Sequence, residues 1–190
     1  MGKPWEDVPE LWKDEMAFLN WLRSQTRKTW SRHPVKTTYC RKRPTVTRAE
    51  AVSTGLILAT DFTKAKKLRP CEMCHEWFPV SALQVDHLDG GYGFKNLDEF
   101  FSWYQRMLVL GFDDIRELCI PCHDKVTLSQ KLHCSLEAVP YHQARIAFGK
   151  LKAAPQRKAL EKLGLPVGSN SDAREATYLE YLGGIYETTT

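Results

Sequence analysis

Two Cys-x-x-Cys pairs, Cys71 with Cys74 and Cys119 with Cys122, restrict the fold of this chain more than any other feature. Each pair presents two sulfurs from one tight bend, and four thiolates complete the tetrahedral shell that zinc prefers. We therefore predict that the four cysteines share one structural zinc ion. A disulfide framework is the alternative. Residues 1–14 contain acidic side chains and no apolar core, so no export signal is indicated and metal binding is favoured.

The remaining candidate ligands are not needed for this site. Cys40 and Cys134 stand alone in the sequence, and we interpret them as free thiols. His75 follows the first pair and is an alternative ligand, although four thiolates suffice. The 44 residues between the pairs exceed the usual gap of a zinc ribbon. An inserted helix and an active-site loop would account for that length.

The composition is that of an ordinary globular protein. Hydrophobic residues make up 43% of the 190 residues and charged residues 26%, with a net charge of +4. No apolar run approaches the roughly 20 residues that span a bilayer, so we expect no membrane association and a cytoplasmic location. The charge is only mildly basic, which makes its distribution more informative than its sum.

The chain is interpreted as three stretches: a basic N-terminal arm (1–64), a cysteine-bearing module (65–130) and a helical C-terminal region (131–190). No acidic residue occurs from Ala17 to Arg48. This basic stretch is either a solvated face or a phosphate-binding surface, and Trp21 and Trp30 within it either pack on the core or stack on bases. Basic helices of the C-terminal region are further possible DNA contacts. The tentative DNA-binding residues are Arg41, Lys42, Arg43, Lys66, Lys67 and Lys125.

The periodicity of apolar residues predicts an α+β fold. Two short strands, 77–80 and 83–87, are expected around a turn, and 115–118 should return the chain to the second cysteine pair. The apolar stripe of 97–110 predicts a helix that ends at Gly111. Pro34 and Pro44 favour extended chain between them. The pattern at 50–57 fits either a helix or a loop and strand. Further helices are expected at 14–23, 123–131, 141–152, 156–163 and 171–182.

Polar residues that suit phosphodiester hydrolysis lie between and beside the cysteine pairs. Neutral imidazole is a suitable base near pH 7, and a carboxylate with an imidazole can hold a divalent ion. Asp86, His87, Asn96 and His123 supply these groups. A lone Asp-His pair would be read as a surface feature. Its position between two zinc-binding pairs favours a catalytic role instead.

The ordered set Cys71-x-x-Cys74, Val85-Asp86-His87, Asn96-Leu97 and Leu118-Cys119-x-x-Cys122-His123 resembles an HNH endonuclease of the His-Me finger class with a four-cysteine zinc site. The resemblance covers about residues 68–130. It implies a ββα-metal core of two antiparallel strands and a helix around one catalytic Mg²⁺ or Mn²⁺ ion. It also implies His87 as general base and Asp86 and His123 as ligands of the catalytic ion. Asn96 would brace the loop that carries His87 or, as in some members, bind the metal.

The resemblance implies a double-stranded DNA substrate and products with 5′ phosphate and 3′ hydroxyl groups. The size of the chain and its basic flanks are similar to free-standing HNH enzymes of phages and mobile introns, which implies a bacterial or phage-infected cell. Three departures stand out: Leu88 and Asp89 replace a frequent Pro after Asp-His, the segment from Asn96 to Cys119 is longer than in compact members, and Lys125 lies two rather than three residues after His123.

Two other functions remain open at this point. A zinc-stabilised nucleic-acid-binding module without activity would keep the fold and the basic arm. An interaction protein, such as a phage factor that binds a host enzyme, would use its tryptophans and helices instead. The joint presence of Asp86, His87, Asn96 and His123 favours the nuclease. The oligomeric state is not predicted.

Overall fold

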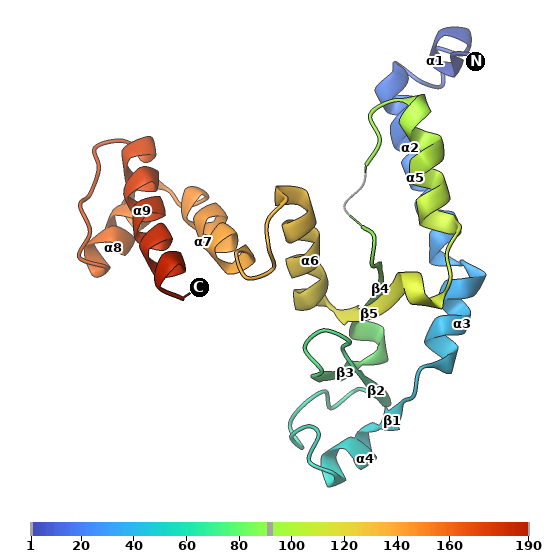
Figure 1. Ribbon diagram of the computed structural model, residues 1–190, viewed down its shortest axis with the longest axis horizontal. Coiled ribbons are helices and arrows are strands. Elements are labelled where there is room, and N and C mark those ends of the chain that lie inside the picture. Colours follow the sequence, from blue (N-terminus) through green and yellow to red (C-terminus); the bar gives the residue numbers. More distant parts are fainter. Residues whose placement is uncertain (1, 91–92, 190) are drawn as a thin grey trace. The chain divides into compact units, whose positions relative to one another are not determined.

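The computed structural model describes residues 2–90 and 93–189 (Figure 1). The chain divides into two compact units, Met1–Thr127 and Leu128–Thr190. Helices combine with small antiparallel sheets, which confirms the predicted α+β class. In the part of the chain that the structure describes, no helix has both the length and the apolar character needed to cross a membrane.

Two small antiparallel sheets form the centre of the first unit. One sheet has the order β1 (Val46–Thr47), β2 (Lys67–Pro70), β3 (Trp77–Pro79), and the other pairs β4 (Leu83–His87) with β5 (Ile115–Cys119). Both strands expected at 77–80 and 83–87 are present, but they do not pair with each other. A 3₁₀ turn, η1 (Val80–Ala82), separates them, so that β3 pairs with β2 and β4 pairs with the later strand β5.

Helix α6 (Ile120–Leu132) follows β5 without a break, so β4, β5 and α6 form two antiparallel strands followed by a helix. The register pairs Asp86 with Arg116 and His87 with Ile115. Strand β5 is largely buried, with Leu118 and Cys119 at its end 0% and 2% exposed. The second cysteine pair therefore begins at a rigid, buried position.

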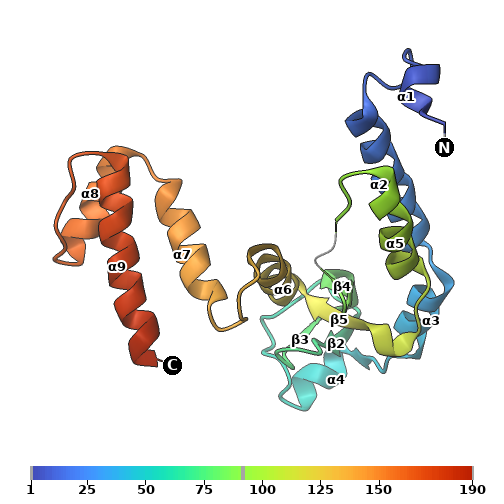
Figure 2. The ribbon, with the colours of Figure 1, turned by 45° about the horizontal axis from the view of Figure 1, so that its top comes forward.

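Helices α2 (Glu15–Ser31) and α5 (Leu97–Leu108) lie side by side (Figures 1 and 2). Side chains of both helices and of the segment before α5 form a buried cluster: Leu19, Phe94 and Trp103, with Leu22, Leu97, Phe100 and Met107 packed against it. The Asp14 carboxylate accepts from the Ala17 N–H and begins α2, and the Asn96 side chain begins α5 in the same way. The helix inserted between the cysteine pairs is thus anchored on the N-terminal arm.

The prediction of extended chain between Pro34 and Pro44 is wrong. Residues Pro34–Lys42 form helix α3, with Pro34 in its first turn, where proline is favoured because its missing N–H has no helical partner. The undecided stretch at 50–57 contains the end of a short helix, α4 (Arg48–Ser53), which Thr47 caps. A four-residue helix, α1 (Pro4–Asp7), begins the unit.

The second unit contains α7 (Val139–Gly149), α8 (Ala153–Lys162) and α9 (Ser171–Thr189), which overlap the three helices predicted for this region. Its core is its own: Val139, Phe148, Leu160 and Leu182 are buried within it. Gly164, at a φ of +68°, ends α8 in the left-handed conformation that glycine adopts without strain. The buried Arg174 guanidinium donates to the Gln156 side chain at 2.9 Å, so its charge has a partner.

Candidate metal centre and adjoining histidine site

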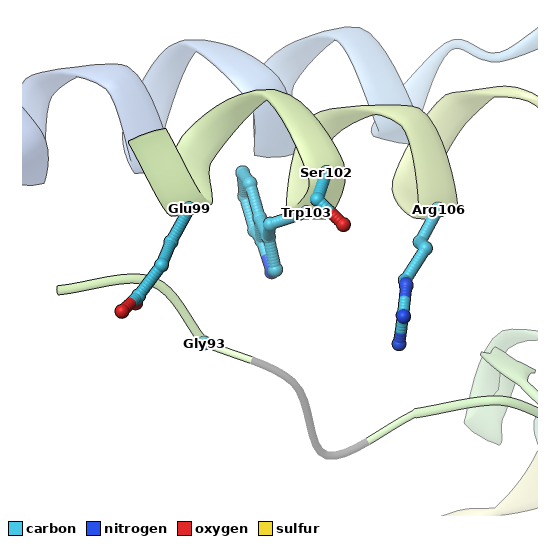
Figure 3. A pocket seen from close by; sticks show the side chains of 5 residues that line it. All are labelled: Gly93, Glu99, Ser102, Trp103 and Arg106. Carbon is cyan, nitrogen blue, oxygen red and sulfur yellow. The ribbon is translucent and has the colours of Figure 1, made fainter. Parts of the chain in front are cut away.

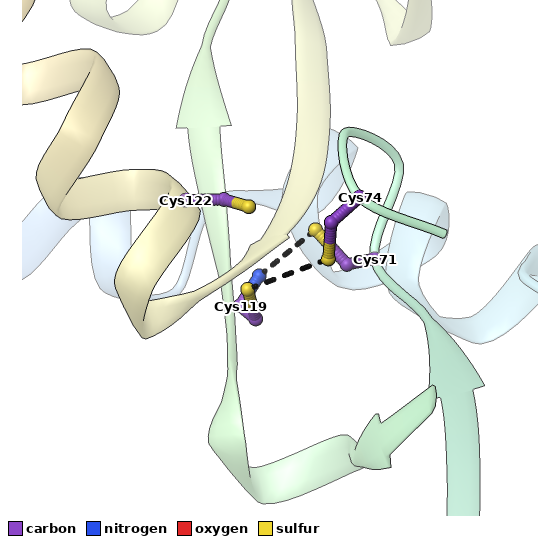
Figure 4. Close-up of side chains that lie close together, drawn as sticks. All are labelled: Cys71, Cys74, Cys119 and Cys122. Carbon is purple, nitrogen blue, oxygen red and sulfur yellow. Dashed lines mark hydrogen bonds between the residues drawn. The ribbon is translucent and has the colours of Figure 1, made fainter. Parts of the chain in front are cut away.

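The four cysteines of the two pairs come together at the junction of the two sheets (Figure 4). Their sulfurs all lie within 4.8 Å of one another, and the Cys74 and Cys119 sulfurs are 3.9 Å apart. Two thiolates on one tetrahedral zinc, each about 2.3 Å from the ion, lie about 3.8 Å apart. The four residues are therefore placed to hold one structural metal ion such as zinc. Cys40 and Cys134 are not part of the cluster.

The local backbone explains how each pair converges. Cys71 follows β2, and the turn after it closes through a hydrogen bond from the His75 N–H to the Cys71 carbonyl oxygen at 3.0 Å. His75 adopts a φ of +61°, the left-handed conformation that lets the chain reverse after Cys74. Cys119 ends β5 and Cys122 lies in the first turn of α6. The two pairs are thus carried by a strand-to-turn and a strand-to-helix junction.

The thiols have different acidities in this arrangement. Burial acts to raise the pKa of Cys71, but N–H groups of Cys74, Cys119 and Met73 stabilise its thiolate and lower the pKa to about 7. Burial raises the pKa of Cys119 and of Cys122. Because a thiolate is the form that binds metal, Cys71 is the first of these to be ready as a ligand near neutral pH.

A network of charged side chains lies beneath the first pair and was not predicted. Glu72, inside that pair, accepts from the Tyr39 hydroxyl at 2.6 Å and from the Arg43 guanidinium at 2.9 Å. Arg69 and Glu117, both nearly fully buried, form an ion pair at 3.0 Å. Burial and the bond to Glu72 raise the pKa of Tyr39. The network ties α3 to the cysteine cluster.

Asp86 and His123 lie side by side. The Asp86 Oδ1 atom and the His123 Nε2 atom are 3.9 Å apart, and their side chains are 13% and 29% exposed. Two ligands of one Mg²⁺ ion, each about 2.1 Å from it, lie at most about 4.2 Å apart, so this pair is within reach of one ion. The other carboxylate oxygen of Asp86 faces Arg116 at 3.4 Å, which fixes the carboxylate across the strands.

His87 meets different neighbours from Asp86, as expected for adjacent residues of a strand. Its Nε2 atom is 3.2 Å from the Met107 carbonyl oxygen. A carbonyl only accepts, so this contact selects the tautomer with the proton on Nε2 and leaves Nδ1 as an acceptor. The imidazole also lies against the Trp30 ring, with centroids 4.2 Å apart. Burial is the largest cause of a lowered His87 pKa.

Asn96 occupies a different place from the one its predicted role requires. Its side-chain oxygen accepts from the Glu99 N–H at 2.9 Å, and its amide donates to the Glu99 carboxylate at 3.2 Å. Asn96 therefore caps α5, and in the described residues no hydrogen bond joins it to the segment that carries His87. That segment is held by the Met107 carbonyl and by the Leu88 N–H, which donates to Asp114 at 2.9 Å.

The tentative DNA-binding residues fall into two groups. Arg41, Lys42, Lys66 and Lys67 are exposed, and Lys125 is half-buried on α6. Arg43 is not available in the same way, because its guanidinium donates to Glu72 and to the Pro70 carbonyl oxygen. We correct its interpretation from a DNA contact to a structural cation. Lys36 and Trp30 border a pocket of about 450 Å³ that also includes His123.

A second, smaller pocket lies on α5. It has a volume of about 170 Å³ and is lined by Gly93, Glu99, Ser102, Trp103 and Arg106 (Figure 3). None of these residues belongs to the predicted site. The histidines and the cysteine cluster therefore remain the only places in the described chain where the sequence predictions and the geometry meet.

Sequence reasoning missed three parts of the site. The Met107 carbonyl acts through the backbone and leaves no mark in the sequence. Trp30 was considered only as a core or base-stacking residue. Arg69 and Glu117 did carry a signal, because each is a charged residue between apolar neighbours in a short strand.

A comparison with protein-family models, with curated proteins and with solved structures finds no match for this chain. The function is therefore argued from the geometry of the site.

Proposed function

We propose that this protein is a zinc-stabilised, divalent-metal-dependent DNA endonuclease of the HNH type. The observation that carries the proposal is the convergence of three predicted residues on one end of β4. Asp86 and His123 approach each other to 3.9 Å, and His87 is next to Asp86 in the chain. The Cα atoms of adjacent residues are only about 3.8 Å apart, so both side chains start within reach of one phosphodiester linkage.

The residues present fit a divalent ion between β4 and α6. A carboxylate oxygen and an imidazole nitrogen are suitable ligands for Mg²⁺ or Mn²⁺, and two protein ligands leave other positions for water and phosphate oxygens. Such an ion would offset the negative charge of the phosphate when bound. Asp86 is oriented for this role by Arg116, and His123 by its place one residue after Cys122.

His87 has the properties of a general base. The contact with Met107 keeps the proton on Nε2, so the Nδ1 lone pair would accept a proton from the attacking water. The lowered pKa keeps the imidazole neutral, and therefore able to accept that proton, at neutral pH. Water would attack the phosphorus, and the 3′ oxygen would leave.

In this proposal the cysteine-bound zinc has a structural role. Its four ligands fill the tetrahedral shell, so the ion itself offers no open position for substrate. Zinc would lock the end of β5 and the start of α6, and with them His123. The exposed Arg41, Lys42, Lys66 and Lys67 would contact the DNA backbone.

Plasmid cleavage tests the proposal. The purified protein is incubated with supercoiled DNA and Mg²⁺ or Mn²⁺, beside His87→Ala and the control His133→Asn. His133 lies outside the site, and asparagine tolerates its φ of +52°. We expect cleavage by the parent and the control and a loss of about 10²- to 10⁴-fold in His87→Ala. Equal cleavage by all three proteins, or none by the parent with either metal ion, would overturn the proposal; in the second case a DNA-binding module without activity would be the better account.

A further inference from the structure

The candidate base is held from two sides by the ends of two helices. Trp30 is the next-to-last residue of α2, and its ring lies 4.2 Å from the His87 imidazole, centroid to centroid, at an angle of 40°. Met107 is the next-to-last residue of α5, and its carbonyl oxygen lies 3.2 Å from His87 Nε2. Both contacts reach β4 from the helix pair in Figure 2.

This helix pair is internally braced, so its two ends keep a fixed spacing. Leu19 of α2 and Trp103 of α5 are buried against Phe94, and Met107 itself packs on that cluster. The Arg23 guanidinium lies over the Phe94 ring, 4.2 Å from its centroid, and donates to the Phe94 carbonyl oxygen. Movement of Trp30 relative to Met107 would disturb this core.

We propose that Trp30 is a positioning residue that, together with the Met107 carbonyl, fixes the orientation of the His87 imidazole. A single hydrogen bond fixes the direction of one nitrogen but leaves the plane of the ring free to turn about that bond. Contact with a second flat ring restricts the plane. The two contacts together define where the Nδ1 lone pair points. The inference rests on the proposed function, in which His87 is the base.

Several charged or titratable groups face His87 besides these contacts. Asp86 precedes it on β4, Lys36 approaches from α3, and His33 lies between α2 and α3. All of them remain when Trp30 is replaced. The change expected from a smaller side chain at position 30 is therefore access of water to the imidazole, which raises the His87 pKa because burial is what chiefly lowers it.

The test uses the full chain with Trp30→Ala, Trp30→Leu and Trp30→Phe. Trp21→Ala is the matched control, since Trp21 lies on the same helix and stacks on Phe18 rather than on His87. The readouts are kcat and KM for cleavage against pH, and nitrogen NMR of the imidazole, whose signal is assigned by its loss in His87→Gln. NMR reports the tautomer and the pKa of His87 without requiring activity.

We expect kcat to fall about 10- to 100-fold in the Ala and Leu variants with little change in KM, as for a misplaced catalytic group. In both, the pH profile and the His87 pKa should move upward. Trp30→Phe keeps a flat ring and should stay near the parent, as should Trp21→Ala. If Trp30→Ala does not fold, the comparison of Leu with Phe decides alone.

Leu and Phe variants that share the parent's kcat, pH profile and His87 tautomer would overturn the inference. So would a loss of kcat with an unchanged His87 tautomer and pKa, which would make Trp30 a DNA contact instead. A parent that does not cleave DNA would remove the proposed function, while the NMR comparison would still decide whether Trp30 orients His87.

Discussion

At the scale of single residues, the site depends on the alternation of a strand. Asp86 and His87 are neighbours in sequence, yet one faces His123 and Arg116 while the other faces Met107 and Trp30. One side chain is thus surrounded by groups that suit a metal ligand, and the other by groups that keep an imidazole neutral and oriented. The same dipeptide supplies two different chemical environments.

The first prediction at this scale concerns the divalent ion. Asp86→Asn and His123→Ala each remove one proposed ligand, so we expect the Mg²⁺ or Mn²⁺ concentration for half-maximal cleavage to rise by at least about tenfold. Zinc content should remain at one ion per chain, because the cysteines are untouched. Cleavage titrated against metal, with zinc measured by atomic absorption, checks both expectations. An unchanged metal requirement in both variants would exclude the pair as ligands.

A second prediction concerns pH. The cleavage step needs neutral His87, and burial lowers its pKa below the ordinary value of 6.5. As pH falls, the base is lost only when the pH passes through this lowered pKa. Single-turnover rates should therefore remain high to below pH 6.5 before they decline. An acidic limb centred above 6.5 would show that His87 is not the group whose protonation stops the reaction.

At the scale of elements, α3 has two different faces. Arg41 and Lys42 are exposed, whereas Arg43, just after the helix, is bound to Glu72 beneath the cysteine cluster. The basic run of the sequence therefore combines cations for solvent or DNA with a cation that stabilises the fold. Their separation gives a prediction that does not depend on catalysis.

The double variant Arg41→Ala/Lys42→Ala should bind DNA more weakly and show a salt dependence flatter by up to roughly 1.8 in slope, since two phosphate contacts would be lost. Its thermal stability should be unchanged. Arg43→Ala should instead lower the free energy of unfolding by roughly 2 kcal/mol, because the half-buried Glu72 loses a charged hydrogen bond. Binding across a salt series and thermal melts measure the two effects. Equal behaviour of the two variants in both assays would contradict this division.

How far the sequence predicted these elements depends on the kind of signal. The cysteine cluster was predictable because four thiolates at this spacing have few other uses. The helix at 97–110 was predictable from its apolar stripe. The helix at Pro34–Lys42 was not, because proline both breaks helices and begins them, and only the neighbouring chain decides between the two.

The bracing of His87 was beyond prediction for a different reason. Sequence order suggested Asn96, but its side chain caps α5. The group that contacts His87 is a backbone carbonyl at the far end of that helix. Any residue carries a carbonyl, so its role comes from the length and packing of α5 and not from the identity of Met107.

At the scale of the whole chain, the two units differ in what stabilises them. The first unit contains the cysteine cluster, whose residues join β2, β5 and α6. The second unit buries its own apolar residues, including Phe148 stacked on Tyr178 with centroids 4.2 Å apart, and holds none of the four clustered cysteines. Loss of metal should therefore affect the units unequally.

Removal of zinc by a strong chelator should unfold the first unit and leave the helices of the second. A structural zinc contributes about 10 kcal/mol or more to folding, comparable with the whole stability of a typical domain. All six tryptophans lie in the first unit, so their fluorescence reports that unit alone. We expect the cooperative melting transition in fluorescence to disappear, while circular dichroism keeps part of the helical signal. Re-addition of zinc should restore the transition.

Single substitutions separate zinc loss from side effects of the chelator. Cys119→Ser should reproduce the loss of the fluorescence transition, because it removes a buried member of the cluster. Cys134→Ser is the matched control, since Cys134 is a thiol outside the cluster, and it should melt like the parent. A normal fluorescence transition after verified removal of zinc would mean that packing alone holds β5 and α6 in place. In that case His123 would owe its position to the apolar contacts of β5 and not to the metal.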